Sequence, residues 1–533
     1  MRAFNFWFNA LRPRNVLKIR SSSSRSLSET LVCQDDELEY LLGKQKIPQG
    51  PYEGGTIWGD NQWRRFMGIE ALAVVKSAWP LCITYFIMVA MKLSDVWFLG
   101  HVGSEAMAVA SLSSIFTTVG GGAVGNGLLT AVDTLAAQAF TAASNPHTLG
   151  VIFQRALAIT AVFTVPVSLI WLSAEPILLS IGQEAHLAQQ VQEFTLKLVP
   201  IIFLMFAATT IRKCMQCMGN MKTTMYMLLT LLPLGVLSNY FFLIYLDLGT
   251  MGGAYHLLTL GFLISSVYTI YFLFGTPFVR DHWPGWSRQA WFGWGEFLRL
   301  GVPGMLSVAT DWAYEVCALI AGTLGQTSLA GQSIILAVNS MLLMIPYALA
   351  AALGVRVGHH LGSHQSQHIR ACTAASTLLG VLVVLINASL MYMFRREISI
   401  QFTVDSEVAL AAERLMPVAS LTHIVTGLGA ILSGALNAYG KQSIVAGFNL
   451  VAYYAIGMPF GFYLTFNYGW GLTGIWSGVV MAGFIKCICE GWALVYLIDT
   501  ESECRKATRR VSAQEETCKF STDVLPTAMP DAE

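Results

Sequence analysis

The chain has 533 residues, of which 54% are hydrophobic and only 12% are charged. A soluble domain carries about 25% charged residues, so this composition predicts a polytopic membrane protein. The formal net charge is zero, which argues against a nucleic-acid partner.

Residues 1–65 form a polar N-terminal segment whose first part is rich in Arg and Ser and lacks acidic residues. This composition is compatible with a mitochondrial transit peptide or with a disordered cytosolic arm. We favour the cytosolic arm, because the positive charges also suit a cytosolic terminus. No secretory signal peptide is predicted.

Twelve apolar runs follow, each about 20 residues or longer and therefore long enough to cross a hydrocarbon core of about 30 Å. They lie near 76–99, 106–137, 149–173, 191–213, 225–246, 252–275, 297–323, 329–355, 371–394, 412–436, 443–466 and 470–498. Lys and Arg concentrate in alternate loops, which places both termini in the cytosol by the positive-inside rule. Arg395 and Arg396, after the ninth run, depart from this pattern.

Several runs contain polar residues that are costly to bury in lipid. In the first run, Asp95 follows Lys92, and the two could neutralise each other near a helix end. The second run ends in AVDTLAAQAF, with Asp133 and Gln138 among small residues. The fifth run holds Asn239, which can form a hydrogen bond to another helix. Gly120 to Gly122 should weaken the second helix.

The seventh run holds two acids, Asp311 and Glu315, four residues apart and therefore on one helical face. No Lys or Arg lies between Gly301 and Gly325 to neutralise them. We predict that these acids and Asp133 couple transport to an ion or a proton. We place six polar or aromatic residues on the substrate pathway: Tyr314, Trp312, Gln138, Asn239, Gln332 and Asp95.

The two halves of the chain repeat each other at an offset of about 221–223 residues, as in GHVG near Gly100 and GTLG near Gly322. Six helices in each half give a parallel repeat, with a substrate path between the halves. The predicted fold is an all-α polytopic membrane protein with twelve transmembrane helices in two pseudo-symmetric six-helix lobes. The expected units are a disordered tail (1–65), an N-terminal lobe (66–276), a cytosolic linker (277–296), a C-terminal lobe (297–498) and a cytosolic tail (499–533).

These segments resemble the eukaryotic, fungal-like type of multidrug and toxin extrusion (MATE) transporter. AVDTLAAQAF is similar to the family signature A-x-D-T-L-x-x-Q-x-x-G-A, and SDVWFLGHVG, GVPGML…DWAYE, VRVGHHLG and ALNAYGKQ…YYAIGMP match in order and spacing. The resemblance covers about residues 70–498. It implies a MATE-like fold and export of organic compounds in exchange for H⁺ or Na⁺. It also places Glu315 at the acid of the seventh helix, with Asp311 one turn earlier.

The sequence departs from the family at three positions. Animal exporters of organic cations carry glutamates where this chain has Ala337 and Thr426, and Thr141 replaces a glycine of the signature. Fewer acids in the C-terminal lobe weaken the expectation of polyvalent organic cations as substrates. They concentrate the expected proton role on Asp311 and Glu315.

Two constellations suggest metals but are not expected to bind them. Cys214 and Cys217 form a C-x-x-C without a second pair, which favours small buried thiols. His360, His364 and His368 are spaced by four, but we place them in a solvated cytosolic loop without a nearby acid.

The leading interpretation is a secondary active antiporter that exports xenobiotics or metabolites and is not an enzyme, since no H-E-x-x-H, G-x-S-x-G or Walker motif is present. The alternative is a lipid or oligosaccharide flippase of related architecture, which would be expected to cluster Arg or Lys in its cavity. A channel would need a selectivity ring or an oligomeric pore. We expect a monomer in the plasma or vacuolar membrane, with a small-molecule substrate, the bilayer as surroundings and no cofactor beyond H⁺ or Na⁺.

Overall fold

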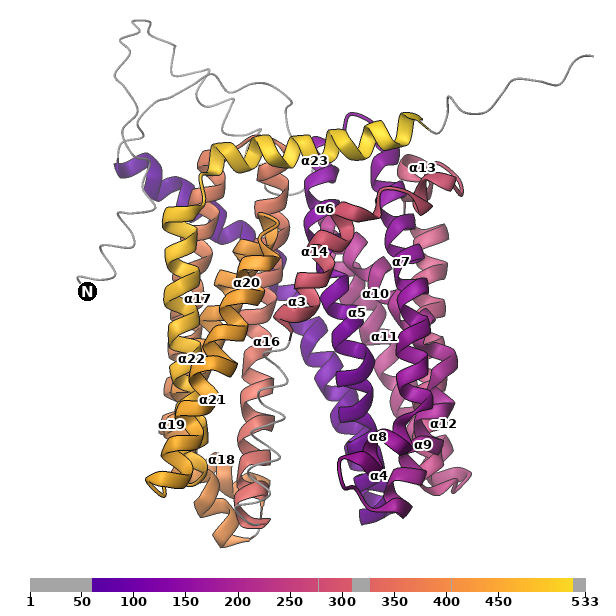
Figure 1. Cartoon of the computed structure of the whole chain (residues 1–533), viewed down its shortest axis with the longest axis vertical. Helices are drawn as coiled ribbons and strands as arrows, with labels where there is room; N and C mark the ends of the chain where they lie inside the picture. Colours follow the sequence, from indigo (N-terminus) through magenta and orange to yellow (C-terminus); the bar gives the residue numbers. More distant parts are fainter. Residues whose placement is uncertain (1–59, 277, 309–325, 404, 521–533) are drawn as a thin grey trace, which may run out of the picture.

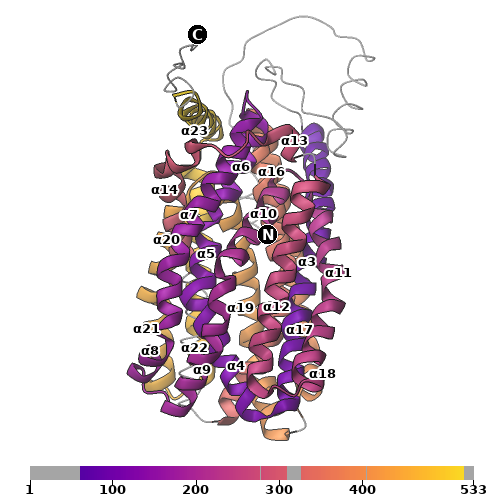
Figure 2. The same cartoon turned by 90° about the vertical axis from the view of Figure 1, so that its right-hand side faces the viewer.

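The computed structural model describes residues 60–276, 278–308, 326–403 and 405–520. Its described elements are all helices, and eleven are long and apolar enough to cross a membrane. They stand side by side in two bundles, an N-terminal lobe drawn in indigo to magenta and a C-terminal lobe drawn in salmon to yellow (Figures 1 and 2). The seventh predicted run begins as α14 and continues into residues outside the described part.

The bounds of the helices follow the predicted runs closely. The N-terminal lobe comprises α3 (Asp60–Val102), α4 (Ser104–Thr117), η1 (Thr118–Gly122), α5 (Ala123–Leu128), α6 (Thr130–Ala142), α7 (His147–Leu172), α8 (Ala174–Ser180), α9 (Ala185–Leu198), η2 (Val199–Ile201), α10 (Ile202–Cys217), α11 (Met221–Asn239), η3 (Tyr240–Tyr245), α12 (Gly249–Ile270) and η4 (Tyr271–Gly275). The linker holds α13 (Phe278–His282) and η5 (Arg288–Trp291). The C-terminal lobe comprises α14 (Trp294–Ser307), α16 (Gln326–Gly362), α17 (Ser366–Met393), α18 (Arg395–Phe402), α19 (Ser406–Ala438), α20 (Gln442–Asn449), η6 (Leu450–Gly457), α21 (Met458–Phe462), η7 (Tyr463–Asn467), α22 (Leu472–Trp492) and η8 (Ala493–Leu497), followed by α23 (Thr500–Phe520).

Two details of the sequence explain local features of these helices. The second span turns π-helical over Thr118–Gly122, where the run of glycines weakens the regular ladder as predicted. Arg395, unexplained by the charge pattern, lies 3.8 Å from the carboxylate of Glu413 and over the ring of Tyr392. A local ion pair therefore accounts for this basic residue.

Helix α3 begins earlier than the sequence indicated. It starts at Asp60, inside the segment expected to be a disordered tail, and Trp63 is buried against Ala371, Ala374 and Ala375 of α17. Charged residues between the apolar ones lower the hydropathy of this stretch, so it did not count as part of the first run. The long α3 consequently packs against the C-terminal lobe at its start and against the N-terminal lobe at its end.

The predicted C-terminal tail also forms a helix. Helix α23 lies across one end of both lobes (Figure 1). On the C-terminal lobe, Cys504 and Ala507 are buried in the core cluster. On the N-terminal lobe, the carboxylate of Glu515 accepts hydrogen bonds from the backbone N–H groups of Ser144 and Asn145, at 2.7 and 3.1 Å. The end of the molecule that carries α23 is called the α23 side below.

Docking of α23 should depend on pH through Glu503. Burial acts to raise the pKa of Glu503, but hydrogen bonds from Lys506 and Lys441 outweigh it and lower the pKa. A carboxyl whose pKa is lowered in the docked state stabilises that state fully at pH values above the pKa of the free carboxyl. This stabilisation is lost as the pH falls through the lowered pKa. Below the ordinary carboxyl pKa of 4.5, α23 should therefore undock progressively, and a Lys441→Met variant should undock at higher pH.

The thiol of Cys504 provides the readout, because its side chain is 2% exposed in the docked helix. Modification of Cys504 by dithiodipyridine, which reacts with accessible thiols in acid, would be followed by mass spectrometry against pH. Identical midpoints for the wild type and Lys441→Met would contradict the prediction.

The two lobes approach closely where α5 meets α14. A Cβ added to Gly304 would lie 2.4 Å from the carbonyl oxygen of Gly127 and 2.1 Å from the hydroxyl oxygen of Thr130. Such backbone contact requires the helices to separate, at a cost of about 1–3 kcal/mol. Gly304→Ala should therefore lower the thermal unfolding midpoint of the purified protein.

Gly295 is the matched control for this substitution. It lies in the same helix, and nothing lies within 4 Å of an added Cβ. Gly295→Ala gains the same helix propensity without the clash, so it should leave the midpoint unchanged or raise it. Equal midpoints for the two variants would show that the lobes do not meet at Gly304 in solution.

Candidate functional site

A polar site lies inside the N-terminal lobe, where α3, α11 and α12 meet. The Oδ1 atom of Asp95 accepts a hydrogen bond from Asn239 Nδ2 at 2.7 Å, and His256 Nε2 lies 3.0 Å from the same oxygen. Asn239 and His256 are each 1% exposed, whereas the Asp95 side chain is 19% exposed. Met91 and Leu260 line the same recess. Two predicted residues from distant helices thus meet at a partly exposed carboxylate.

The arrangement around Asp95 suits binding and release of a cation. Among the described residues, no Lys or Arg pairs with Asp95, and Lys92 is exposed instead of neutralising it. An unneutralised carboxylate in a membrane segment is costly, and an added proton or metal cation removes that cost. The imidazole of His256, 3.0 Å from the carboxylate, is a second group with a proton-binding nitrogen.

Asp133 lies in a different environment. Its carboxylate forms an ion pair with Lys213 of α10, and its side chain is 41% exposed. Lys213 lies inside α10 and is 13% exposed. The structure does not bring Asp133 to the Asp95 site, and its coupling role stays a prediction.

Gln138 and Thr141 of the signature lie at the contact between the lobes. Gln138 Nε2 donates to the carbonyl of Ala438 at 2.8 Å, and Thr141 Oγ1 donates to the carbonyl of His359 at 2.8 Å. These bonds join α6 to the ends of α19 and α16 on the α23 side. The signature therefore helps to hold this side together in the present conformation, and a substrate contact for Gln138 stays a prediction.

The remaining predicted residues divide into two groups. Gln332 in α16 is 1% exposed, and its amide has no hydrogen-bond partner within the described part of the chain. Asp311, Trp312, Tyr314 and Glu315 lie outside the described residues.

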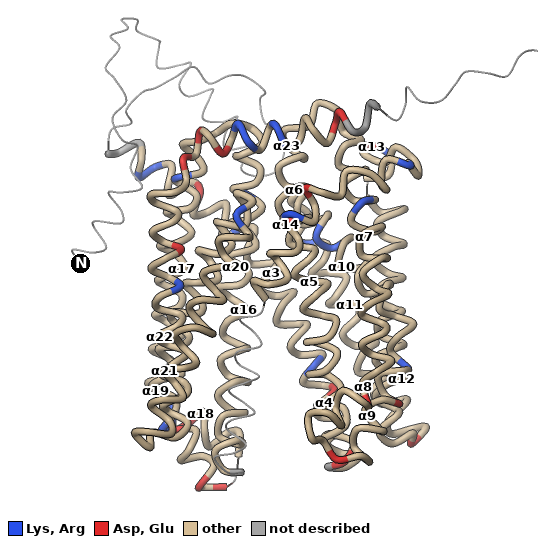
Figure 3. Tube along the Cα trace, in the orientation of Figure 1, with Lys and Arg blue, Asp and Glu red and all other residues tan. Residues whose placement is uncertain are grey.

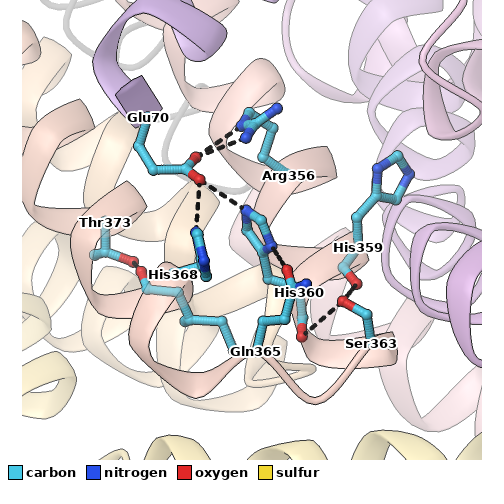
Figure 4. Close-up of polar contacts among 9 residues, drawn as sticks. Glu70, Arg356, His359, His360, Ser363, Gln365, His368 and Thr373 are labelled. Atoms are coloured by element: carbon cyan, nitrogen blue, oxygen red, sulfur yellow. Dashed lines mark hydrogen bonds and ion pairs between the residues drawn. The ribbon is translucent and has the colours of Figure 1, made fainter. Parts of the chain in front are cut away.

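The histidine-rich stretch differs from the expectation. His360 belongs to α16 and is 1% exposed, and an acid does lie beside it: Glu70 Oε1 is 3.2 Å from His360 Nε2 and 3.2 Å from His368 Nδ1 (Figure 4). Of the three spaced histidines only His364 is exposed. The expectation of a solvated loop without an acid was wrong, because Glu70 comes from a part of α3 that is distant in sequence.

Among the titratable residues of the membrane segments that escaped the sequence reasoning are His256 and Glu490. His256 lies in the sixth run, and Glu490 lies fully buried in the twelfth, where Ser433 donates to it at 2.8 Å and Lys486 lies 4.0 Å away. An ionisable residue within an apolar run is itself a signal of function, so both could have been found. Their partners come from other helices, which the spacing along the chain does not reveal.

Comparison with known proteins decides the family. The MatE family model matches residues 80–241 and 303–463, once in each lobe. The chain belongs to the MatE family. An uncharacterized transporter of Schizosaccharomyces pombe, C323.07c, is 31% identical over 439 residues, covering 81% of this chain and 81% of that protein. Multidrug and toxin extrusion protein 1 of Homo sapiens is 27% identical over 421 residues, covering 79% of this chain and 74% of that protein.

Solved structures agree with this assignment. The crystal structure of the eukaryotic MATE transporter AtDTX14 matches with a TM-score of 0.77 and 25% identity, covering 83% of this chain and 100% of that chain. The fold class predicted from the sequence is thereby confirmed. This MATE-family chain is a multi-pass integral membrane protein of a transporter family.

Proposed function

We propose that this MATE-family transporter is a secondary active antiporter that exports organic compounds in exchange for H⁺ or Na⁺. The Asp95–Asn239–His256 site carries the proposal, because it combines a partly exposed carboxylate with an imidazole and lacks a Lys or Arg partner among the described residues. The imidazole favours H⁺ over Na⁺, since it supplies a proton-binding nitrogen where a Na⁺ site would use oxygen. The relatives named multidrug and toxin extrusion proteins support organic compounds as the substrate class.

The distribution of charge supports an orientation with both termini in the cytosol. Blue segments, marking Lys and Arg, gather toward the α23 side, whereas the opposite end shows more red, marking Asp and Glu, than blue (Figure 3). The start of α3 and the whole of α23 lie on this basic side (Figure 1). By the positive-inside rule the α23 side faces the cytosol. Asp95 lies seven residues before the end of α3, so it is nearer the opposite side, which faces the outside or the vacuolar lumen.

Alternating access would then proceed as follows. From an acidic compartment, a proton reaches the Asp95 site and neutralises it, which favours release of a cationic substrate. Opening of the α23 side exposes the site to the cytosol, where the proton leaves and substrate binds. One pH unit supplies about 1.4 kcal/mol per proton, enough to bias the two conformations tenfold. Asp311 and Glu315 are proposed as the proton-binding acids of the C-terminal lobe, with the role that Asp95 has in the N-terminal lobe.

The flippase alternative has little support in the basic residues of the membrane segments. Such a transporter would need free Lys or Arg side chains in its cavity to bind a phosphate-linked head group. Arg155 instead donates to the carbonyl of Gln289 and to the side chain of Gln514, and Lys486 lies beside Glu490. These side chains therefore have partners within the protein.

The test is efflux of a fluorescent organic cation from proteoliposomes that contain the full chain. An inward proton gradient and an inward Na⁺ gradient would be imposed separately, each with the matching ionophore as a control. We expect the proton gradient to drive efflux and the ionophore to abolish it. Efflux independent of both gradients, or movement of a labelled lipid without either gradient, would refute the antiporter proposal.

A further inference from the structure

A second cluster of titratable side chains lies on the α23 side, and its acid is near the start of α3, whereas Asp95 is near the end of the same helix. Glu70 of α3, His360 of α16 and His368 of α17 point toward one another (Figure 4). One oxygen or nitrogen atom from each residue lies within 4.8 Å of the other two. Glu70 and His360 are essentially buried, at 0% and 1% exposed.

The distances in this cluster suit coordination of a metal ion. Zn²⁺ binds histidine nitrogen at about 2.0–2.1 Å and carboxylate oxygen at about 2.0–2.2 Å, and tetrahedral geometry then places neighbouring ligand atoms about 3.4 Å apart. Glu70 Oε1 lies 3.2 Å from His360 Nε2 and 3.2 Å from His368 Nδ1. A metal ion can therefore enter with small movements of the side chains.

The neighbours of His360 and Glu70 hold these two groups as outer residues hold metal ligands. His360 Nδ1 lies 2.7 Å from Gln365 Oε1, so it donates its proton there and leaves the Nε2 lone pair facing Glu70. Arg356 donates to one carboxylate oxygen, Oε2, at 2.7 and 3.0 Å, so that the other oxygen, Oε1, faces the two histidines.

In this tautomer two hydrogen-bond acceptors, His360 Nε2 and Glu70 Oε1, face each other inside the protein. His360 Nε2 has no hydrogen bond of acceptable geometry within the described part of the chain, although Glu70 Oε1 is near. A buried nitrogen lone pair beside a carboxylate is unfavourable unless a cation lies between them. A metal ion satisfies both atoms, and so does a second proton on His360.

We infer that Glu70, His360 and His368 form a binding site for a divalent transition metal, of which Zn²⁺ suits the two imidazoles and one carboxylate best. A fourth position is left for water. The positively charged guanidinium of Arg356 repels the metal ion, so we expect weaker metal binding than at a similar site without an arginine. A bound ion would tie the start of α3 to α16 and α17 on the α23 side.

The test uses the full-length protein, purified in detergent, freed of any polyhistidine tag and stripped with a chelator. Zn²⁺ would be titrated in competition with a chromogenic chelator, and we expect one equivalent per chain to be held by the protein. His360→Ala and His368→Ala should each lose that equivalent. His364→Ala is the matched control, because His364 lies between the two in sequence but is exposed and contacts Thr508; it should retain the equivalent.

A second measurement needs no variant and therefore does not depend on how the variants fold. Co²⁺ bound to the wild-type protein should show the intense visible absorption of tetrahedral coordination, and Zn²⁺ should displace it. Zn²⁺ binding that survives in the His360→Ala/His368→Ala double variant would overturn the inference. So would a Co²⁺ spectrum identical to that of the ion in buffer, which would leave the second proton on His360 as the explanation of the cluster.

Discussion

Replacing Asp95 by Asn is expected to reduce export driven by a pH gradient to the level of liposomes without protein. Asn keeps the shape of the side chain and can still accept the hydrogen bond from Asn239, which is 2.7 Å long in the wild type. It cannot bind or release a proton, so the exchange loses its driving reaction while the helices stay packed. The measurement is efflux of a fluorescent organic cation from proteoliposomes under an imposed pH gradient.

Two further variants distinguish the effect of the Asp95 carboxylate on export from the effect of the residues around it. Ser94→Ala alters the lining of the same recess without removing a charge, and it should export at close to the wild-type rate. His256→Gln removes the imidazole 3.0 Å from Asp95 and should slow export rather than abolish it, because Asp95 and its hydrogen bond from Asn239 remain. Wild-type export by a correctly inserted Asp95→Asn protein would remove Asp95 from the coupling mechanism.

The largest expected effect on stability comes from Glu70→Ala. Glu70 is 0% exposed and accepts two hydrogen bonds from Arg356, whose side chain is 12% exposed. Removing the acid leaves a mostly buried guanidinium without its carboxylate, which destabilises a protein by about 3–5 kcal/mol. The measurement is the free energy of unfolding in mixed micelles, with a chelator present so that metal binding does not contribute.

The chain offers a matched control and a double variant for this prediction. Glu105 lies 3.5 Å from His186 in an ion pair whose side chains are 61% and 69% exposed, so Glu105→Ala should cost less than about 1 kcal/mol. Glu70→Ala combined with Arg356→Met should cost less than the sum of the single changes, because both charges are then absent. Equal losses for Glu70→Ala and Glu105→Ala would show that the buried pair contributes no more than the exposed one.

Apolar length was sufficient to predict most of the helices, because a segment that crosses lipid must satisfy its backbone within the helix. The spans from α7 to α12 and from α16 to α22 lie close to the predicted runs. Helical segments that mix charged and apolar residues were missed for the same reason. The start of α3 and the whole of α23 mix charged and buried residues, so neither forms an uninterrupted apolar run in the sequence.

Polar residues could be selected from the sequence, but their partners could not. Asp95 and Asn239 were both assigned to the substrate pathway, and the structure joins them across 144 positions of the chain. The contact of Glu70 with His360 and His368 was missed, because it depends on how the first helix packs against the other lobe. A single sequence shows which side chains are costly to bury, and only the packing of the helices shows what compensates each of them.

The fixed length of α23 has a consequence for how the α23 side opens. A helix of 21 residues is about 32 Å long and cannot lengthen without breaking its own hydrogen bonds. Its start is held on the C-terminal lobe by the buried Cys504 and Ala507. Its other end is held on the N-terminal lobe by the buried Val511, by Gln514, which accepts a hydrogen bond from Arg155, and by the exposed hydrogen bonds of Glu515. Because the helix cannot stretch, separation of the lobes must release one of these two attachments. The distance of Glu515 from Ser144 and the exposure of Cys504 together therefore report which end of α23 lets go when this side of the transporter opens.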